Sequence, residues 1–405
     1  MTIAFICGRD IEFAGDTDGG SVLIRNLARE LGARRHSVDI FTPENLTGST
    51  YRVKGRLAPH GLAGVTMRRF PVRGSAAELA PLNESGSYFR NRIVLSERMA
   101  EYFTDGILEA YDRIYIFHIA NAFGIVANGS CPIERTVLFP MLLGAAYAQF
   151  ETVPPEYLLA ERVTLARIQH IAAASAAEAA MLQTAYDVPL NKTLIMQRGY
   201  DPDVFVPLVR AAVPRDRTHI ICANTIRPQK NQRFFLEFVE EARARLPGLV
   251  VHLVGLGQDN PQSAYGVYAR TFAADIKKRC LSPYFALHPV MPQRGVARLM
   301  RECNLSLYPS YTETFGKSVL ESVVSGLPTV AFNDVPAYGE CIESGHTGML
   351  VPRSVEAAVA AVEELRANAA LYRALSAAGI AEANRFSWPV IVHRFLYALE
   401  ARVAS

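Results

Sequence analysis

The sequence predicts an α/β protein built from two doubly wound domains that face a central cleft. Short apolar runs alternate with amphipathic helical patterns near the N-terminus, and the same alternation begins again after residue 205. Strands separated by helices imply right-handed βαβ crossovers and mostly parallel sheets. With 405 residues, the chain is long enough for two such domains.

Five elements predict the first domain. The helix nearest the N-terminus carries Leu23, Leu27 and Leu31 on one stripe, and Pro43 is expected to end the second strand. The expected strands are Thr2–Cys7, Ser37–Thr42 and Arg113–Ile119, and the expected helices are Gly20–Ala33 and Tyr88–Leu108.

The second domain is predicted from a similar series. A segment rich in Gly, Pro and Asp, residues 198–207, is typical of a linker between the two domains. Ligands of doubly wound sheets bind at the carboxyl ends of the strands. The expected strands are His219–Ala223, Leu249–Val254, Phe285–Pro289 and Leu305–Pro309, and the expected helices are Gln232–Leu246, Val355–Ala383 and Trp388–Val403.

Composition excludes several classes of protein. Charged residues make up 20% of the chain and the net charge is +3, which argues against a dedicated nucleic-acid binder. The six cysteines form no CxxC pair, so neither a disulfide framework nor a zinc site is expected. The N-terminus lacks the pattern of a signal peptide, and no apolar run is long enough to span a membrane. We therefore expect a soluble cytoplasmic protein.

The segment from residue 310 to residue 329 is the most informative part of the chain. Glu313 lies just before Gly316, which opens a predicted helix, and Glu321 follows eight residues after Glu313. Gly326 and Pro328 then close the helix. A helix N-terminus is an anion site, and carboxylates beside it are suited to hold hydroxyl groups attached to the anion. An anion flanked by hydroxyls describes a sugar nucleotide.

Glu321 has a plainer explanation as well. It lies four residues after Lys317, a spacing that allows a surface ion pair on one helix face. However, Val319, Leu320 and Val323 indicate that most of this helix is buried. A carboxylate in a largely buried helix needs a functional reason.

Three loops carry further candidates. Gly19 and Gly20 open the first helix and suit a phosphate, although a plain turn explains them equally. His118 ends an apolar strand and is suited to a sugar hydroxyl or a developing charge, although a lone histidine often serves packing. Arg227 and Lys230 follow the first strand of the second domain and suit a diphosphate, with a solvated loop as the alternative.

The pair of glutamates, in the order Glu-x7-Glu, resembles the donor motif of the family 4 retaining glycosyltransferases, which have the GT-B fold. The resemblance covers nearly the whole chain, although only the glutamate motif is specific by itself. Two positions depart from the family pattern, since Thr225 stands where an arginine is usual and Thr314 where glycine or proline is frequent. The other similar segments are Gly19–Gly20, Ile116–His118, Ala172–Ser175, Arg198–Pro207, Lys230, Val254–Gly257, Tyr308–Ser310 and Arg385–Trp388.

The resemblance implies a division of the chain into three parts. Residues 1–204 would form a Rossmann-like domain that binds the acceptor, and residues 205–385 a Rossmann-like domain that binds the NDP-sugar. Residues 386–405 would form a closing helix that packs back on the first domain.

The resemblance also implies roles for individual residues. Glu321 would hold the ribose hydroxyls and Glu313 those of the donor sugar, while His118 would lie near the transferred sugar. Lys230 would hold the diphosphate, with Arg227 shifted into the place of the arginine missing at position 225. The remaining donor contacts would come from Gly19, Gly20, Gly255, Met291, Thr314, Phe315 and Gly316.

The resemblance further implies retention of anomeric configuration and independence from metal or other cofactors. We find no clear nucleophile for the opposite face of the sugar, so we expect same-face attack with the leaving phosphate taking the acceptor's proton. Two Asp-x-Asp pairs, Asp16–Asp18 and Asp201–Asp203, have a spacing seen in metal sites. Neither follows a predicted strand as a nucleotide–metal site requires, so no metal is expected.

The acceptor is the least defined part of the prediction. Residues 45–77 carry six cations and no acidic residue, which suits a phosphorylated acceptor or a weak contact with an anionic surface, although a solvated basic loop is the simpler explanation. Three functions remain open: transfer to a small or natural-product hydroxyl, transfer to a lipid-linked or polysaccharide glycan, and sugar-nucleotide binding without transfer, as in an epimerase-like protein. The cations are Arg52, Lys54, Arg56, Arg68, Arg69 and Arg73.

Overall fold

The computed structural model describes residues 1–8, 19–44, 62–72, 88–256 and 263–403. Their contacts divide the chain into two compact units. The first unit comprises Met1–Gln197 with Ile391–Ser405, and the second comprises Arg198–Val390. The expectation of two doubly wound parallel α/β domains is confirmed.

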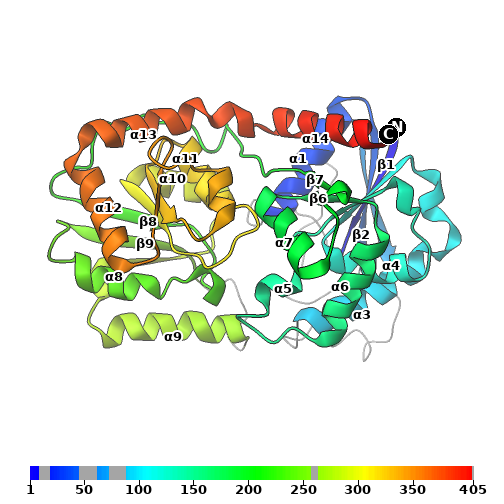
Figure 1. Cartoon of the computed structure of the whole chain (residues 1–405), viewed down its shortest axis with the longest axis horizontal. Helices are drawn as coiled ribbons and strands as arrows, with labels where there is room; N and C mark the ends of the chain where they lie inside the picture. The colour runs from blue at the N-terminus through cyan, green and yellow to red at the C-terminus, as the bar shows by residue number, and fades with distance from the viewer. Residues whose placement is uncertain (9–18, 45–61, 73–87, 257–262, 404–405) are drawn as a thin grey trace. The chain divides into compact units, whose positions relative to one another are not determined.

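In the first unit, the described residues form a sheet of seven strands in the order β3-β2-β1-β4-β5-β6-β7, with every pairing parallel. The central strands are almost entirely apolar because helices cover both faces (Figure 1). The strands are β1 (Thr2–Cys7), β2 (Ser37–Glu44), β3 (Val65–Pro71), β4 (Arg113–Phe117), β5 (Thr136–Phe139), β6 (His170–Ala173) and β7 (Thr193–Ile195). The helices are α1 (Gly19–Ala33), α3 (Tyr88–Tyr102), α4 (Phe123–Ala127), α5 (Gly144–Tyr147), α6 (Pro155–Arg167) and α7 (Ala176–Tyr186).

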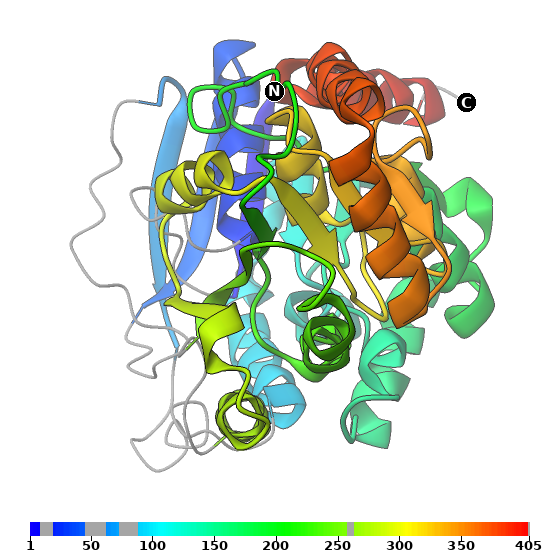
Figure 2. The same ribbon diagram turned by 90° about the vertical axis from the view of Figure 1, so that its left-hand side faces the viewer.

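In the second unit, the described residues form a six-stranded parallel sheet in the order β10-β9-β8-β11-β12-β13. Helices lie on both of its faces, with α8 and α12 packed together on one and α11 and α13 on the other (Figures 1 and 2). The strands are β8 (Thr218–Cys222), β9 (Leu249–Leu256), β10 (Phe285–Pro289), β11 (Leu305–Tyr308), β12 (Thr329–Phe332) and β13 (Met349–Val351). The helices are α8 (Phe234–Ala242), α9 (Ala264–Lys278), α10 (Gln293–Glu302), α11 (Lys317–Val324), α12 (Val355–Ala367) and α13 (Ala369–Ala381). Helix α14 (Trp388–Val403) begins in the second unit, and its residues from Ile391 onward belong to the first unit.

Several predicted boundaries are wrong for identifiable reasons. Strand β2 continues through Pro43, because β1 accompanies it only as far as Phe41 and the proline is paired with β3 alone. The helix expected to reach Leu108 ends at Tyr102, and short 3-10 turns follow around Gly106, which is left-handed. The long helix expected after Val355 is two helices. Asn368 separates them, since its side chain caps α13 by accepting the N–H of Leu371.

Other elements were shifted or missed. Strand β4 ends at Phe117, two residues early, and α8 is shorter at both ends than expected. The pattern did not predict β3, β5, β7 or β13, which have at most seven residues each. None of the helices in the described residues has both the length and the apolar character needed to cross a membrane.

A buried carboxylate holds the loop that follows β5. Glu161, on α6, has no solvent exposure and accepts the Gly144 N–H at 2.9 and 3.1 Å through its two oxygens. The Tyr186 hydroxyl donates to the same carboxylate and itself accepts the Ala145 N–H at 3.0 Å. Burial raises the pKa of Glu161 to about 7, and the hydrogen bonds from Tyr186 and Gly144 oppose that rise.

Replacement of Glu161 by Gln should remove part of the pH dependence of stability. A glutamate in the unfolded chain has a pKa near 4.5, so between that pH and about pH 7 the folded state holds a proton that the unfolded state has released. Stability therefore falls as pH rises through this window, by up to about 3 kcal/mol, and then levels off. Thermal unfolding at about pH 5 and pH 8 should favour the variant at the higher pH. The same pH dependence in both proteins would contradict this expectation.

Candidate functional site

The order in which the chain adds strands to the second sheet reverses between β8 and β11. From β8 the chain proceeds outward to β9 and β10, then returns to β11 on the other side of β8. These two strands pair in parallel, Leu305 with Ile220 and Ser306 with Ile221. The loops that leave their carboxyl ends therefore begin side by side and diverge, which is where doubly wound sheets bind ligands.

Glu313, after β11, meets Lys230, after β8, in this loop region. The Lys230 Nζ lies 2.7 Å from Glu313 Oε2, and the Ser310 hydroxyl donates to Oε1 at 2.9 Å. The Glu313 side chain is 11% exposed and that of Lys230 is 20% exposed. Two residues predicted to hold different parts of a donor thus form a shielded ion pair with each other.

Glu321 is held on one of its two oxygens. It lies on the buried α11, and Lys317 Nζ forms the ion pair that the sequence spacing allowed, with Glu321 Oε1. The side chain is only 7% exposed, so the pair is not the solvated surface pair of the plainer explanation. The Gln293 amide donates to the same Oε1 at 3.1 Å. No hydrogen bond or ion pair from a described residue reaches Oε2.

Gly316 allows α11 to begin beside these carboxylates. Its φ is +88°, and a Cβ at this position would lie 3.0 Å from the Tyr338 ring. Phe315 before it is buried, with its ring centroid 6.4 Å from that of Phe386, and Thr314 is half-buried. Glycine is therefore required at this N-terminus by both backbone conformation and space.

The end of β9 packs against the loop that follows β8. Gly255 has a φ of +110°, and a Cβ there would lie 2.9 Å from the Cα of Thr225. The Arg227 guanidinium lies 4.5 Å from the centre of the Tyr265 ring, the start of α9. Met291 lies before α10, and a Cβ on Gly295 would approach its sulfur at 3.2 Å. Thus Gly255 and Thr225 are brought together, while Arg227 faces an aromatic ring.

The first unit repeats the same topology. The order in which the chain adds strands to this sheet reverses between β1 and β4. These two strands pair in parallel up to Cys7 and Phe117. Gly19 and Gly20 begin α1, which follows β1, and His118 follows β4. His118 therefore stands at the carboxyl end of the strand next to β1, and the role of Gly19, Gly20 and His118 in a ligand site stays a prediction.

His118 has a strained backbone and a defined tautomer. Its φ is +78°, unusual for a residue with a side chain. Ring atom Nδ1 accepts the Ala120 N–H at 3.2 Å, so in the neutral imidazole the proton is assigned to Nε2. Nε2 lies 2.9 Å from the Tyr88 hydroxyl, to which it donates. Tyr88 lies on α3, thirty residues away in sequence, and no local pattern pointed to it.

The acidic pairs and the basic segment fall partly outside the described residues. Asp16 and Asp18 lie outside the described residues. In the linker, Asp201 Oδ1 accepts the Asp203 N–H at 3.0 Å, which gives this pair a role in a local turn. No group of three or more His, Cys, Asp or Glu side chains that could hold a metal occurs in the described parts of the chain.

Of the six cations in residues 45–77, only Arg68 and Arg69 are described; the other four lie outside the described residues. Arg68 Nε lies 2.6 Å from Asp39 Oδ2, which also accepts the Tyr111 hydroxyl at 2.6 Å. The charge of Arg68 is thus balanced within the unit.

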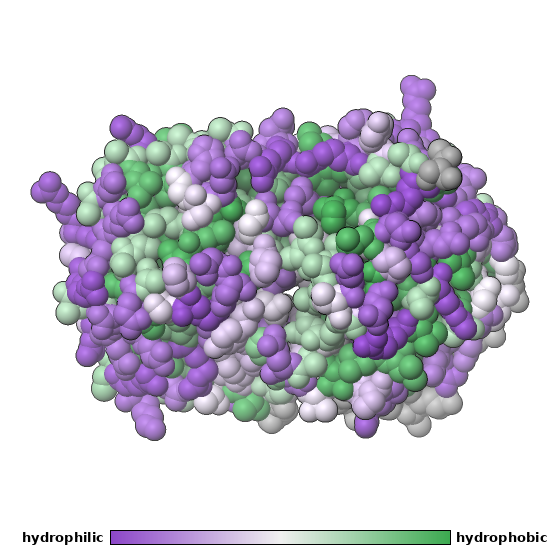
Figure 3. Space-filling model, in the orientation of Figure 1, coloured by the Kyte–Doolittle hydropathy of each residue, from purple (hydrophilic) through white to green (hydrophobic). Residues whose placement is uncertain are grey.

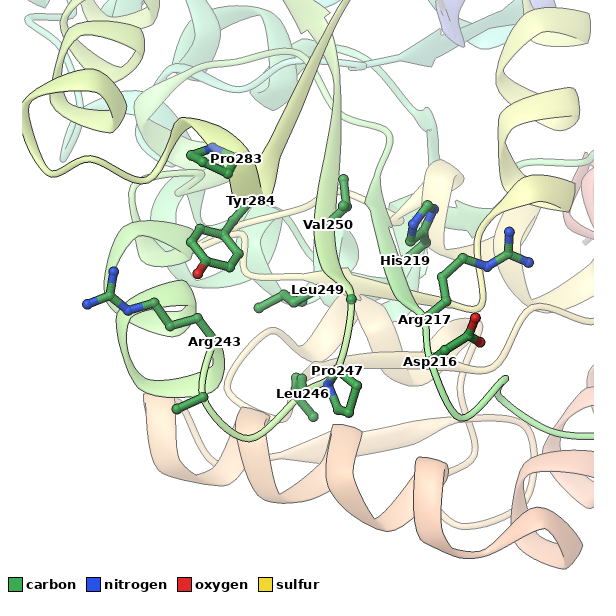
Figure 4. A pocket seen from close by; sticks show the side chains of 12 residues that line it. Asp216, Arg217, His219, Arg243, Leu246, Pro247, Leu249, Val250, Pro283 and Tyr284 are labelled. Atoms are coloured by element: carbon green, nitrogen blue, oxygen red, sulfur yellow. The ribbon is translucent and has the colours of Figure 1, made fainter.

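A pocket in the second unit opens at the opposite ends of the strands, where β8, β9 and β10 begin (Figure 4). Its lining includes Arg217 just before β8, Leu249 at the start of β9 and Tyr284 just before β10. Figure 4 shows the side chains of Arg217 and Arg243 pointing to opposite sides, so they do not converge on one anion. The pocket lies at the amino ends of the strands, away from Lys230 and the glutamates, and we do not assign the donor site to it.

The chain is similar in sequence to known glycosyltransferases. The family model described as "Glycosyl transferases group 1" matches residues 210–393. A D-inositol 3-phosphate glycosyltransferase of Kribbella flavida is 26% identical over 407 residues, covering 95% of this chain and 91% of the relative.

Two solved structures share the fold. Sucrose-phosphate synthase from Thermosynechococcus elongatus superposes with a TM-score of 0.77 at 20% identity, covering 100% of this chain and 99% of its own. Anabaena HepE in complex with UDP-glucose gives a TM-score of 0.71 at 17% identity, covering 99% of this chain and 100% of its own.

Replacement of Gly316 by Ala should destabilise the second unit. The left-handed backbone and the close Tyr338 ring together should lower the free energy of unfolding by about 1–3 kcal/mol. Gly339 is a matched control in the same unit, because a Cβ there would meet no atom within 4 Å. Urea unfolding should show Gly339→Ala within about 0.5 kcal/mol of the parent protein. Equal effects of the two substitutions would contradict the structural requirement at Gly316.

Proposed function

Because the chain is a glycosyltransferase with the GT-B fold, we propose that it transfers a hexose or N-acetylhexosamine from a UDP-sugar to a hydroxyl of a small or natural-product acceptor, with retention and without metal. The observation that carries this proposal is the Lys230–Glu313 pair at the strand reversal of the second unit. A cation suited to a diphosphate and a carboxylate suited to sugar hydroxyls lie 2.7 Å apart there.

The two glutamates differ in what they offer a donor. Glu321 Oε2 accepts no hydrogen bond from any described residue, so it can accept from ribose hydroxyls in its present position. Both oxygens of Glu313 already accept, from Ser310 and Lys230. A bound donor would replace Lys230 at Glu313 with a sugar hydroxyl, and the released lysine would bind the diphosphate.

The proposed mechanism is same-face attack. As the glycosidic bond to phosphate breaks, Lys230 stabilises the charge that develops on the leaving diphosphate, and the α11 N-terminus adds its positive end. The leaving phosphate takes the acceptor's proton. In the first unit, the Nε2–H of His118, which now bonds to Tyr88, is a donor suited to a sugar hydroxyl. Trapping of a covalent glycosyl-enzyme with a slow donor would contradict this mechanism.

Lys230 is a fixed source of positive charge, which supports transfer without a metal ion. Undiminished activity in the presence of EDTA is the expected result.

Two comparisons support the choice of substrates. The relative from Kribbella flavida is named for D-inositol 3-phosphate, a small phosphorylated polyol. The Anabaena structure holds UDP-glucose, which supports UDP as the nucleotide.

A lipid-linked or polysaccharide acceptor is the second candidate. The observation that favours it is on α6 of the first unit, where Leu159 is 62% exposed and Val163 41% exposed. Apolar side chains lie among polar ones over this part of the surface (Figure 3). Dependence of activity on lipid vesicles would favour this candidate over a small acceptor.

The donor should be identified first by a thermal-shift panel. UDP, GDP, ADP and TDP are compared, followed by the intact sugar nucleotides of the best binder. A rise in Tm with UDP that exceeds the others is the expected result. No shift with any nucleotide would overturn the proposed donor site. Nucleotide binding with no glycoside formed on any acceptor would favour the third function, binding without transfer.

Replacement of Glu313 by Ala should abolish transfer without loss of nucleotide binding. The substitution removes the group proposed to hold the sugar, so kcat should fall by about 10²–10³-fold. It also releases Lys230 for the diphosphate, so UDP should bind at least as tightly as before. Product formation measures the expected loss of turnover, and calorimetry measures the expected retention of UDP affinity. Full activity in this variant would contradict the assignment of Glu313.

Replacement of Glu321 by Ala should act mainly on nucleotide binding. Loss of the ribose contact should weaken UDP binding by about tenfold or more. It also leaves the mostly buried Lys317 without its ion-pair partner, so Tm is measured alongside the affinity. An unchanged UDP affinity in a folded variant would contradict the proposed role.

A further inference from the structure

Gln293 contributes to the position of Glu321 from a different element of the second unit. It is the first residue of α10, and Glu321 lies on α11, 28 residues later in sequence. The Gln293 Nε2 and the Lys317 Nζ both bond to Glu321 Oε1. Because two donors hold one oxygen, rotation of the carboxylate would break both contacts, and Oε2 is left as the acceptor to which no described residue donates.

The orientation of the Gln293 amide follows from its partner. A carboxylate accepts hydrogen bonds only, so the nitrogen end must face Glu321. The carbonyl end, Oε1, is then buried with no hydrogen-bond partner among the described residues, on a side chain whose residue is 7% exposed. A buried acceptor without a donor is costly, and an apolar side chain of similar size would avoid that cost. The residue is explained by what its nitrogen does for Glu321.

Gln293 and Lys317 make different contributions. Lys317 supplies charge at the end of a flexible chain, which neutralises the mostly buried carboxylate. The planar amide of Gln293 donates in a fixed direction and approaches from a second helix. Removal of Gln293 would therefore leave Glu321 neutralised but free to rotate about its last bond.

We propose that Gln293 is a positioning residue that presents Glu321 Oε2 to the ribose hydroxyls of the nucleotide, so that the site distinguishes ribonucleoside diphosphates from nucleotides without these hydroxyls. The proposal rests on the proposed function, since it takes the nucleotide to bind at Glu321. It adds a residue outside the Glu-x7-Glu motif and a selectivity that this residue controls.

The test compares hydroxylated and dideoxy nucleotides. The full-length protein and its Gln293→Met variant are titrated by calorimetry with UDP, GDP and ADP and with the 2′,3′-dideoxy form of each. The parent protein should bind its best ribonucleotide at least about tenfold more tightly than the dideoxy form. In Gln293→Met this ratio should fall to about threefold or less, because only the hydroxyl contacts depend on the orientation of Glu321.

A second variant and a control separate positioning from a general structural effect. Gln293→Asn keeps the amide but shortens its reach, and it should lower the ratio as the Met variant does. Gln229→Met removes another buried glutamine of the same unit whose Oε1 also lacks a partner among the described residues. Gln229 does not contact Glu321, so this variant should keep the parent ratio, whatever its effect on overall affinity.

Each outcome has a distinct meaning. A parent-like ratio in both Gln293 variants would overturn the inference and leave the proposed function intact. A ratio near one in the parent protein would overturn the ribose role of Glu321 and the inference with it. Absence of binding to all six nucleotides would overturn the proposed function itself.

Discussion

The strand order of the two parallel sheets is the constraint on which the rest of the structure depends. A chain that leaves a strand, crosses over and later returns to its other side must send two neighbouring loops in opposite directions. In the second unit this happens between β8 and β11, and it brings Lys230 and Glu313 together from positions 83 residues apart. In the first unit it happens between β1 and β4, and it sets His118 beside the carboxyl end of β1. The topology brings the loops together, and the side chains on these loops supply the chemical groups.

Several residues at these sites have unusual backbone conformations. His118, Asn231 and Gly316 have positive φ in segments that follow a strand, and Gly255 has positive φ near the end of β9. Two are glycines because a side chain would collide with a neighbour, while His118 accepts the strain with its imidazole fixed by Ala120 and Tyr88. Strain of this kind persists where the surroundings determine a conformation strongly, which is typical of binding sites.

The sequence predicted the parts of the structure that are encoded locally. Strand β10 and helix α14 occur over the predicted residues, and the glutamate motif marked the start of α11. Features that depend on distant partners were not predictable. The sequence pattern around Asn368 predicts one uninterrupted helix. The break between α12 and α13 depends on a single capping side chain, which the pattern does not reveal. Nothing near Gln293 or Tyr88 in sequence indicates that one meets Glu321 and the other His118, because those contacts exist only after the sheet has formed.

The closeness of Lys230 and Glu313 has a consequence for selectivity between whole ligands and fragments. Each of these charges already has a partner in the other, so the pair adds little net charge to the site. A fragment that offers only phosphate would draw away the lysine and strand a largely shielded carboxylate, and a free sugar would strand the lysine. Only a molecule that carries both a diphosphate and sugar hydroxyls can replace both partners at once. The ion pair thus favours an intact sugar nucleotide over free phosphate or a free sugar.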